Sequence, residues 1–294
     1  MKINRYLINF RNRRIAPGLV IACILFNCLS ASKASNFFPE NKSDSLDYSW
    51  ERVSVSIGGF LTGMSTDMLL GNEQLGLGLA INLENALGLE TSDVVLRGDA
   101  DITFGKHERS NVQMGYIGFF RNSTKVIESE ITIGDYVFPV GTQITSRFDI
   151  QIFKSSYNYS YFADKRIKLG ASIGLYVMPI KFSAKSSNQG ETVADFIAPL
   201  PVLGLDARFA VSPKICIKQE FEVLYLKFSN LTGSITDINF RIEYTPWKHI
   251  GFGIGYNSFQ IRLEKENKGN RIIDFTGSIK TGYAGLLFYG KFYF

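Results

Sequence analysis

Cysteine and histidine are scarce in this chain, and their scarcity excludes several kinds of site. The 294 residues include 3 cysteines and 2 histidines. Cys23 and Cys28 lie in the N-terminal apolar stretch, which leaves Cys216 alone. One remaining cysteine excludes an internal disulfide framework and a cysteine-based metal site. His107 and His249 lack the close spacing of paired metal ligands. We therefore expect no metal and no cofactor.

The same scarcity bears on catalysis, because histidine is the usual general base near neutral pH. His107 lies in "GKHERSN" and His249 in "WKHIG", and both stretches are short connections between apolar segments. We expect these side chains to be turn histidines, and we expect the chain not to be an enzyme.

Long apolar runs are also missing. The longest, "IAPGLVIACILFNCLSA" (residues 15–31), is shorter than the roughly 20 residues that a membrane-spanning helix needs. Five basic residues precede it, and the small residues of "SASKAS" follow it. This order is typical of a secretory signal peptide, so residues 1–34 are predicted to be removed by cleavage after Ala34. A permanent anchor and a lipoprotein signal, which "VIAC" loosely resembles, are the alternatives.

The net positive charge of the chain disappears with the signal peptide, and what remains is close to neutral. The chain has 32 basic and 27 acidic residues, and residues 1–34 contain six of the basic and none of the acidic ones. The mature chain then has 26 bases against 27 acids, a net charge of −1. We therefore expect no nucleic-acid partner.

Helical periodicity is absent from the mature chain, whereas alternation of apolar and polar residues runs to the last residue. Residues 35–50 are expected to form a flexible lead-in, and residues 51–294 a single all-β domain. The alternating segments are 51–66, 93–105, 111–127, 142–162, 166–182, 199–212, 214–229, 235–246, 251–265 and 279–294.

Short and long connections alternate between these segments. "GKHERSN", "ADKRI", "VSPKI" and "TPWKHIG" are short, and the stretches around 67–92, 128–141, 183–198, 230–234 and 266–278 are predicted to be long connections. Long strands with short turns at one end and long loops at the other are typical of an outer-membrane barrel. We predict a closed antiparallel transmembrane barrel of ten strands, with periplasmic short turns. Twelve strands, with an extra hairpin in 67–92, and eight strands are the alternatives.

The two faces of each segment predict what surrounds the barrel and what fills it. Ile238, Phe240 and Ile242 alternate with Asn239 and Arg241. The apolar rows are expected to face lipid, where a charge is costly, and the charged rows to face the lumen. The predicted lumen network comprises Arg97, Asp99, Asp101, Arg147, Asp149, Asp206, Arg208, Lys218, Glu220, Glu222, Arg241 and Glu243, together with Lys154, Asp237, Arg262, Glu264 and Lys291.

Nearly equal numbers of acids and bases in this set predict ion pairing and a lumen filled by side chains. The balance also disfavours a strongly ion-selective pore. Two acidic pairs, Asp99 with Asp101 and Glu220 with Glu222, have a spacing that suits acid–base chemistry. They keep open the alternative of a lipid- or peptide-processing enzyme.

One segment departs from simple alternation. In "RFDIQIFKSSYNYSYF" the apolar residues Phe148, Ile150 and Ile152 occupy even positions, and the tyrosines from Tyr157 onward occupy odd ones. A β-bulge near Ile152 and Phe153 would keep both sets on the lipid side, so a bulge is predicted there. A strand end that projects past the membrane is the alternative.

The last residues, "FYGKFYF", place Phe292 and Phe294 on one apolar face. This ending resembles the carboxy-terminal assembly signal of Gram-negative outer-membrane proteins. The resemblance implies the barrel-assembly machinery as a partner, and outer-membrane lipid and lipopolysaccharide as the surroundings.

Four further stretches carry a wider resemblance: "INLENALGLE", "YVFPVGTQITSRFDIQIFKSSYNYSYF", "APLPVLGLDARFAVSP" and "WKHIGFGIGYN". They resemble a group of uncharacterised, porin-like outer-membrane β-barrel proteins of Gram-negative bacteria. The resemblance covers most of residues 75–294 and implies the barrel fold and the outer membrane, without a substrate or catalytic residues. "INLENALGLE" falls in the first long loop, where it is expected to extend a strand or to fold back over the mouth.

These observations favour a non-enzymatic outer-membrane barrel that acts structurally, in surface interaction or as a narrow channel.

Overall fold

The computed structural model describes residues 50–70, 81–133, 136–186, 190–228, 231–265 and 277–294. The predicted signal peptide and the lead-in, apart from Trp50, lie outside these residues. None of the helices in the described part is long and apolar enough to cross a membrane.

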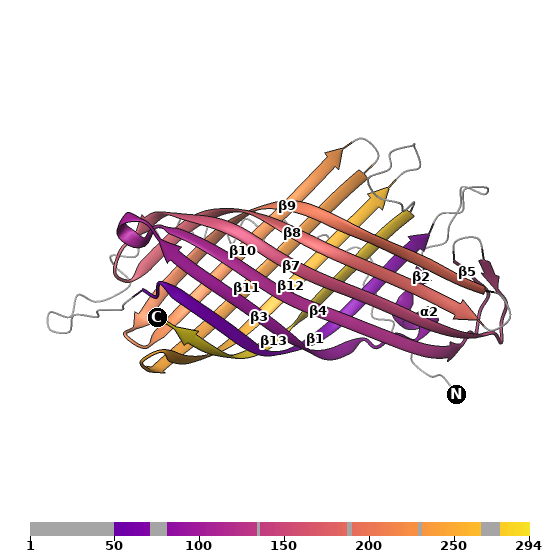
Figure 1. The fold of residues 1–294 in the computed structure, drawn as a ribbon. Coiled ribbons are helices and arrows are strands. Elements are labelled where there is room, and N and C mark those ends of the chain that lie inside the picture. The colour runs from indigo at the N-terminus through magenta and orange to yellow at the C-terminus, as the bar shows by residue number, and fades with distance from the viewer. Residues whose placement is uncertain (1–49, 71–80, 134–135, 187–189, 229–230, 266–276) are drawn as a thin grey trace, which may run out of the picture. The chain divides into compact units, whose positions relative to one another are not determined.

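Ten long strands form one antiparallel barrel, which confirms the predicted fold class and strand number (Figure 1). Each strand pairs with its neighbours along the chain, and the last strand pairs with the first to close the barrel. The strands are β1 (Val53–Leu70), β3 (Ser92–Phe104), β4 (Ser110–Val126), β7 (Gln143–Ala163), β8 (Ile167–Ser186), β9 (Gly190–Ser212), β10 (Ile215–Phe228), β11 (Leu231–Trp247), β12 (Ile250–Lys265) and β13 (Gly277–Tyr293).

Smaller elements lie in the connections. The first long connection contains β2 (Ile81–Asn82), which pairs with β1, and the short helix α2 (Leu83–Leu87). The 3-10 helix η1 (Lys106–Glu108) forms the turn between β3 and β4. A hairpin of β5 (Ile131–Ile133) and β6 (Tyr136–Phe138) lies between β4 and β7. The start of β1 and the last residue meet at the short-turn end, where the backbone N–H of Arg52 donates to the carbonyl of Phe294.

Residues 183–198, predicted to be a long connection, are mostly strand. β8 continues to Ser186 and β9 begins at Gly190, and the two pair in one register from Ser186↔Gly190 to Ile167↔Phe209. The inward side chains here, such as Ala184, Phe196 and Ala198, are apolar, and the outward ones mix polar with apolar residues. The stretch therefore lacks the alternation of polar inward and apolar outward residues on which the prediction relied.

The predicted bulge near Ile152 and Phe153 is wrong. β7 pairs with β4 in a single register from Ser110↔Tyr159 to Val126↔Gln143. Its register against β8 shifts only near the short-turn end, between Ser160 and Phe162. Even-numbered residues therefore point inward along most of β7, and Phe148, Ile150 and Ile152 are buried inside the barrel. What changes along the strand is the chemistry of the inward row.

The interior of the barrel consists of two parts. The polar half, next to the short turns, buries charged residues such as Arg97, Asp206, Lys218, Arg241 and Glu243. The apolar half, next to the long connections, is one hydrophobic cluster; its members include Phe60, Phe119, Phe148, Met178, Ile180, Phe182, Phe196, Leu200, Ile235, Phe259, Ile261 and Ile279.

The outer surface reverses in the same way. Around the polar half, Ile102, Ile242, Ile254 and Phe292 are exposed. Around the apolar half the exposed outer side chains include Lys181 and Asp195, which form an ion pair of 3.1 Å between Nζ and Oδ2. The prediction that every apolar row faces outward is thus correct for the polar half and wrong for the apolar half.

Two strand pairs separate before their strands end. β3 and β4 pair only from Arg97↔Ile117 to Phe104↔Ser110, although β4 continues to Val126. β9 and β10 pair only up to Leu203↔Val223. In the described residues, the wall of the apolar half therefore has a gap in its backbone ladder between β3 and β4, next to the segment that contains α2 (Figure 1).

Candidate functional site

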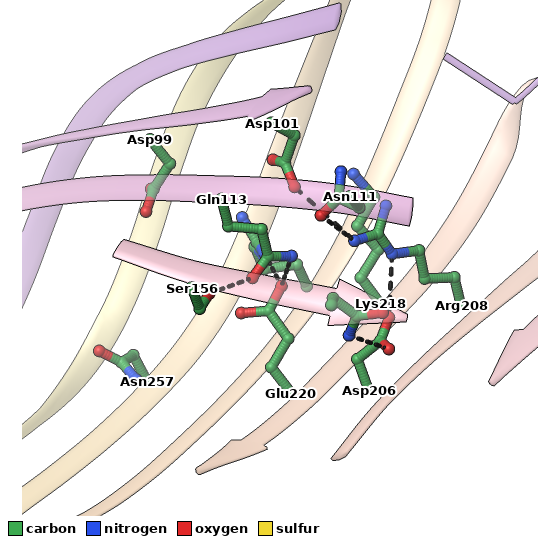
Figure 2. Close-up of polar contacts among 12 residues, drawn as sticks. Asp99, Asp101, Asn111, Gln113, Ser156, Asp206, Arg208, Lys218, Glu220 and Asn257 are labelled. Atoms are coloured by element: carbon green, nitrogen blue, oxygen red, sulfur yellow. Dashed lines mark hydrogen bonds and ion pairs between the residues drawn. The ribbon is translucent and has the colours of Figure 1, made fainter. Parts of the chain in front are cut away.

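The polar half is an ion-pair network built from neighbouring strands. Each strand contributes alternate residues, since side chains two apart point to the same side. The inward residues shown in Figure 2 come from β3, β4, β7, β9, β10 and β12: Asp99, Asp101, Asn111, Gln113, Ser156, Asp206, Arg208, Lys218, Glu220 and Asn257.

Glu220 lies where three strands contribute donors. It forms an ion pair with Arg241 of β11. Its Oε1 accepts a hydrogen bond of 3.1 Å from Gln113 of β4. Lys154 of β7 lies between two acids, 3.6 Å from Glu220 and 2.9 Å from Glu222. Because the lumen is crossed by these contacts, side chains from opposite walls meet rather than line an open channel.

A second group lies nearer the short turns. Arg208 is 3.1 Å from Asp206 on its own strand and 3.7 Å from Asp101 of β3. It also donates a hydrogen bond of 3.1 Å to Asn111 of β4. Asn158 donates to Asp206 from β7. Arg208 thus contacts acids and an amide from three strands, and Asp206 links the group to a fourth strand through Asn158.

Glu243 holds a third group next to the closing strand pair. Lys218 lies 3.1 Å from its carboxylate, and Lys291 of β13 also pairs with it. Tyr289 donates a hydrogen bond of 2.9 Å to its Oε1. Lys291 pairs in addition with Glu51, just before β1. This carboxylate therefore connects β10 and β11 with the last strand.

Aromatic rings mark the boundary between the two halves. The hydroxyl of Tyr176 lies 2.6 Å from Glu222 Oε2 and 2.7 Å from Asp237 Oδ2, while its ring belongs to the apolar cluster. The ring centroids of Tyr176 and Phe259 are 6.0 Å apart, and Phe259 stacks on Tyr283 at 5.1 Å. Phe119 lies 5.0 Å from Tyr283. These rings form a layer across the interior with its hydroxyl groups toward the charges.

Among the described residues, the apolar half buries an ion pair that sequence reasoning did not predict. Arg121 of β4 lies 2.7 Å from Glu84 of α2, and their side chains are 1% and 3% exposed. Arg121 also donates a hydrogen bond of 2.7 Å to Thr66 Oγ1. The sequence does contain a signal: in "YIGFFRNS", Ile117, Phe119 and Arg121 occupy one face, and the arginine interrupts an inward apolar row. In the "INLENALGLE" stretch, Ile81 and Asn82 pair with β1, and the residues after them fold back with Glu84 buried inside the barrel, whereas the expected position was over the mouth.

Most of the predicted lumen residues lie in the polar half. The structure places inside it Arg97, Asp99, Asp101, Lys154, Asp206, Arg208, Lys218, Glu220, Glu222, Asp237, Arg241, Glu243 and Lys291. Phe292 and Phe294 are exposed on the outside at the short-turn end.

Four predicted lumen residues lie elsewhere. The side chains of Arg147 and Arg262 are 65% and 61% exposed, and each pairs with an acid two residues later, Asp149 and Glu264. These pairs lie on the outer face of the apolar half. They were placed in the lumen because the prediction assumed that polar rows point inward along the whole strand.

The two histidines and the acidic pairs lie in different surroundings. His249 Nδ1 lies 2.8 Å from the carbonyl of Tyr293, and its ring lies 5.0 Å from that of Phe294. His107 is exposed in η1. Within the described ranges, no group of three or more His, Cys, Asp or Glu side chains is arranged to hold a metal ion. Asp99, Glu220 and Glu222 each contact a cation rather than an open cleft.

No protein-family model matches the chain. No curated protein matches it either, so the resemblance to the uncharacterised porin-like group stays a prediction.

Comparison with solved structures finds three proteins to report. The outer membrane protease OmpT from Escherichia coli has 10% identity and a TM-score of 0.50, over 87% of this chain and 99% of that chain. The transport unit of the autotransporter AIDA-I from Escherichia coli has 8% identity and a TM-score of 0.39, over 92% and 97%. The attachment invasion locus protein Ail of Yersinia pestis, in complex with a heparin analogue, has 11% identity and a TM-score of 0.33, over 82% and 99%. At 10% identity the likeness to OmpT shows the fold alone.

Proposed function

We propose that this protein is a non-enzymatic integral outer-membrane barrel that anchors a rigid platform for surface interaction outside the cell. The polar half is the membrane anchor, and the apolar half projects into the external water. The observation that supports this proposal most strongly is the reversal of both faces along the same strands.

The reversal follows from the solvent around each half. Lipid cannot hydrate a charge, so the outside of the anchor is apolar and its charges are confined to the lumen. Water surrounds the projecting half, so that half has the pattern of a soluble β-domain, with charges such as Lys181 outside and Phe182 inside.

The anchor is proposed to be closed to ions. Ten strands enclose a space that side chains nearly fill, in contrast to the 16–18 strands of a water-filled porin. The contacts of Glu220, Arg208 and Glu243 cross that space, and the layer that includes Tyr176, Phe259 and Tyr283 covers it. The carboxylates paired with cations also support a non-enzymatic role, because a general base has to reach its substrate.

Two measurements test the proposal. Fractionation of cells is expected to place the mature protein in the outer membrane, with an electrophoretic mobility that changes on heating. Recovery as a soluble periplasmic protein would contradict the proposal.

Purified protein in planar bilayers is expected to show no steady conductance. A high, steady conductance would overturn the closed lumen while leaving the location intact.

A further inference from the structure

The apolar half contains one carboxylate-binding arrangement that the platform role does not require. Both oxygens of the Glu84 carboxylate are bound. Oε1 accepts 2.7 Å from Arg121 Nη1, and Oε2 accepts 2.9 Å from the backbone N–H of Thr66. This N–H lies beyond the last paired residues of β1 and β3, Gly63↔Ser92. A guanidinium and a main-chain N–H thus hold one complete carboxylate group.

The arrangement is built into the barrel wall, whereas its carboxylate is not. Arg121 and Thr66 belong to the long strands β4 and β1, and Thr66 Oγ1 lies 3.0 Å from Thr281 of β13. Glu84 belongs to α2, a helix of five residues. A helix this short has no stability of its own and is held by its packing.

The rest of the α2 segment is apolar. Leu83, Leu87 and Leu89 are 0%, 1% and 2% exposed and belong to the same buried cluster as Phe119 and Phe148. One carboxylate attached to several aliphatic groups therefore fills this part of the barrel. A long-chain carboxylate has the same two parts, a single carboxylate and an aliphatic chain.

The stability of the fold does not by itself explain why Arg121 and Glu84 form a buried ion pair. A buried pair often contributes no more than well-packed apolar residues of the same volume, because both charges lose their hydration. Arg121 Nε is buried without a hydrogen-bond partner in the described residues, so the guanidinium keeps a donor that α2 does not use. The guanidinium carbon Cζ of Arg121 lies over the Phe148 ring, 5.1 Å from its centroid.

We propose that the site around Arg121 and Thr66 binds amphipathic carboxylates with a long aliphatic chain, and that the α2 segment occupies this site as an internal competitor. The ligand carboxylate replaces that of Glu84, and the chain replaces the three leucines. The inference goes beyond the surface role and does not depend on it, because the purified protein can be tested in any membrane mimic.

The test uses the full-length mature protein in lipid nanodiscs, with empty nanodiscs to correct for partition into lipid. Palmitic acid and hexadecanol are titrated, since they differ only in the headgroup. We expect Glu84→Gln to bind palmitic acid about tenfold more tightly than the wild type, which corresponds to the loss of one charge-assisted hydrogen bond by the competing segment. Hexadecanol is expected to bind more weakly than palmitic acid to each protein, because it lacks the carboxylate that Arg121 holds. The exposed control Glu264→Gln is expected to behave as the wild type.

Equal affinities of Glu84→Gln and wild type for palmitic acid, or equal affinities of Glu84→Gln for the acid and the alcohol, would overturn the proposal. Arg121→Gln is expected to remove the preference for the acid. Heat-dependent mobility checks that each variant is folded.

A disulfide lock keeps the proposal testable if these variants fail to fold. A Cβ atom on Gly88 would lie 3.2 Å from Oγ of Ser123, so the double variant Gly88→Cys and Ser123→Cys brings two thiols together; Gly88 has a φ of +71°, so its substitution strains the backbone, and formation of the disulfide is verified first by thiol titration. Cys216 is replaced by Ala in this background. The oxidised protein is expected to bind no palmitic acid, and reduction is expected to restore the weak binding of the wild type. Binding that is the same in both states, or absent in both, would contradict the proposal.

Discussion

Along β8, Ile180 and Phe182 point inward and Lys181 points outward, whereas along β11 Arg241 and Glu243 point inward and Ile242 points outward. The two strands belong to one closed sheet, and the inward parity of β11 changes only at its short-turn end, between Tyr244 and Trp247. The difference therefore lies in the surroundings. A strand fixes which side chains share a face, and the solvent around each part of the barrel determines which face is polar.

The largest effect is expected inside the polar half. Glu243→Gln leaves Lys218 and Lys291 without their shared carboxylate, and breaking such a buried pair costs about 3–5 kcal/mol. The free energy of unfolding in urea, followed by heat-dependent mobility, measures the loss.

The matched control is Glu264→Gln, whose ion pair with Arg262 is exposed on the other half. It is expected to change the free energy of unfolding by less than about 1 kcal/mol. Equal losses for both variants would mean that the two halves do not differ in their interior.

The second effect compares the outer faces. Ile242→Arg places a charge on the outside of the polar half, which costs about 2–4 kcal/mol near the middle of a bilayer. Ile197→Arg places the same charge on the outside of the apolar half and is expected to cost about 0–1 kcal/mol. The yield of assembled protein in outer membranes checks both. A loss for Ile197→Arg as large as that for Ile242→Arg would show that lipid surrounds both halves.

A smaller effect concerns packing inside the apolar half. Ile180→Val removes one methylene from a fully buried side chain, for an expected loss of about 0.5–1.5 kcal/mol. Ile173→Val, on the outer face of the same strand, is expected to be close to neutral because that side chain is 59% exposed. Urea unfolding of the two variants should order them in this way; the reverse order would contradict the assignment of the core.

The smallest effect is expected for Lys181→Ala. The pair of Lys181 with Asp195 is exposed at both ends and contributes between about 0 and 1 kcal/mol, less at high salt. A loss above that range that persists at high salt would indicate that this surface is not in water.

The sequence predicted the barrel, its strand number and most of the polar half, because alternation and short turns are local signals. In "NFRIEY" the inward row is polar or charged and the outward row is apolar, so the sequence shows which face is directed to lipid. In "RFDIQIF" the alternation is equally clear, but its interpretation depends on whether lipid or water lies outside. The prediction for Arg147 is wrong for that reason. The predicted bulge is wrong because it assumed that lipid lies outside the whole strand.

The contact between Arg121 and Glu84 could not be predicted. The residues are 37 apart in the sequence, and α2 meets β4 only because the pairing of β3 with β4 stops at Arg97↔Ile117. The end of a strand pairing depends on the twist and packing of the whole wall, which no local pattern encodes.

The most direct test of the two-half account is cysteine labelling in intact cells, with Cys216 replaced by Ala. Single cysteines at Lys181 and Arg262 are predicted to react with a membrane-impermeant maleimide added outside. Single cysteines at Ile242 and Ile254 are predicted to resist it and to react with a lipid-soluble maleimide. Protection of positions 181 and 262 from the impermeant reagent, together with its reaction at 242 and 254, would contradict the account.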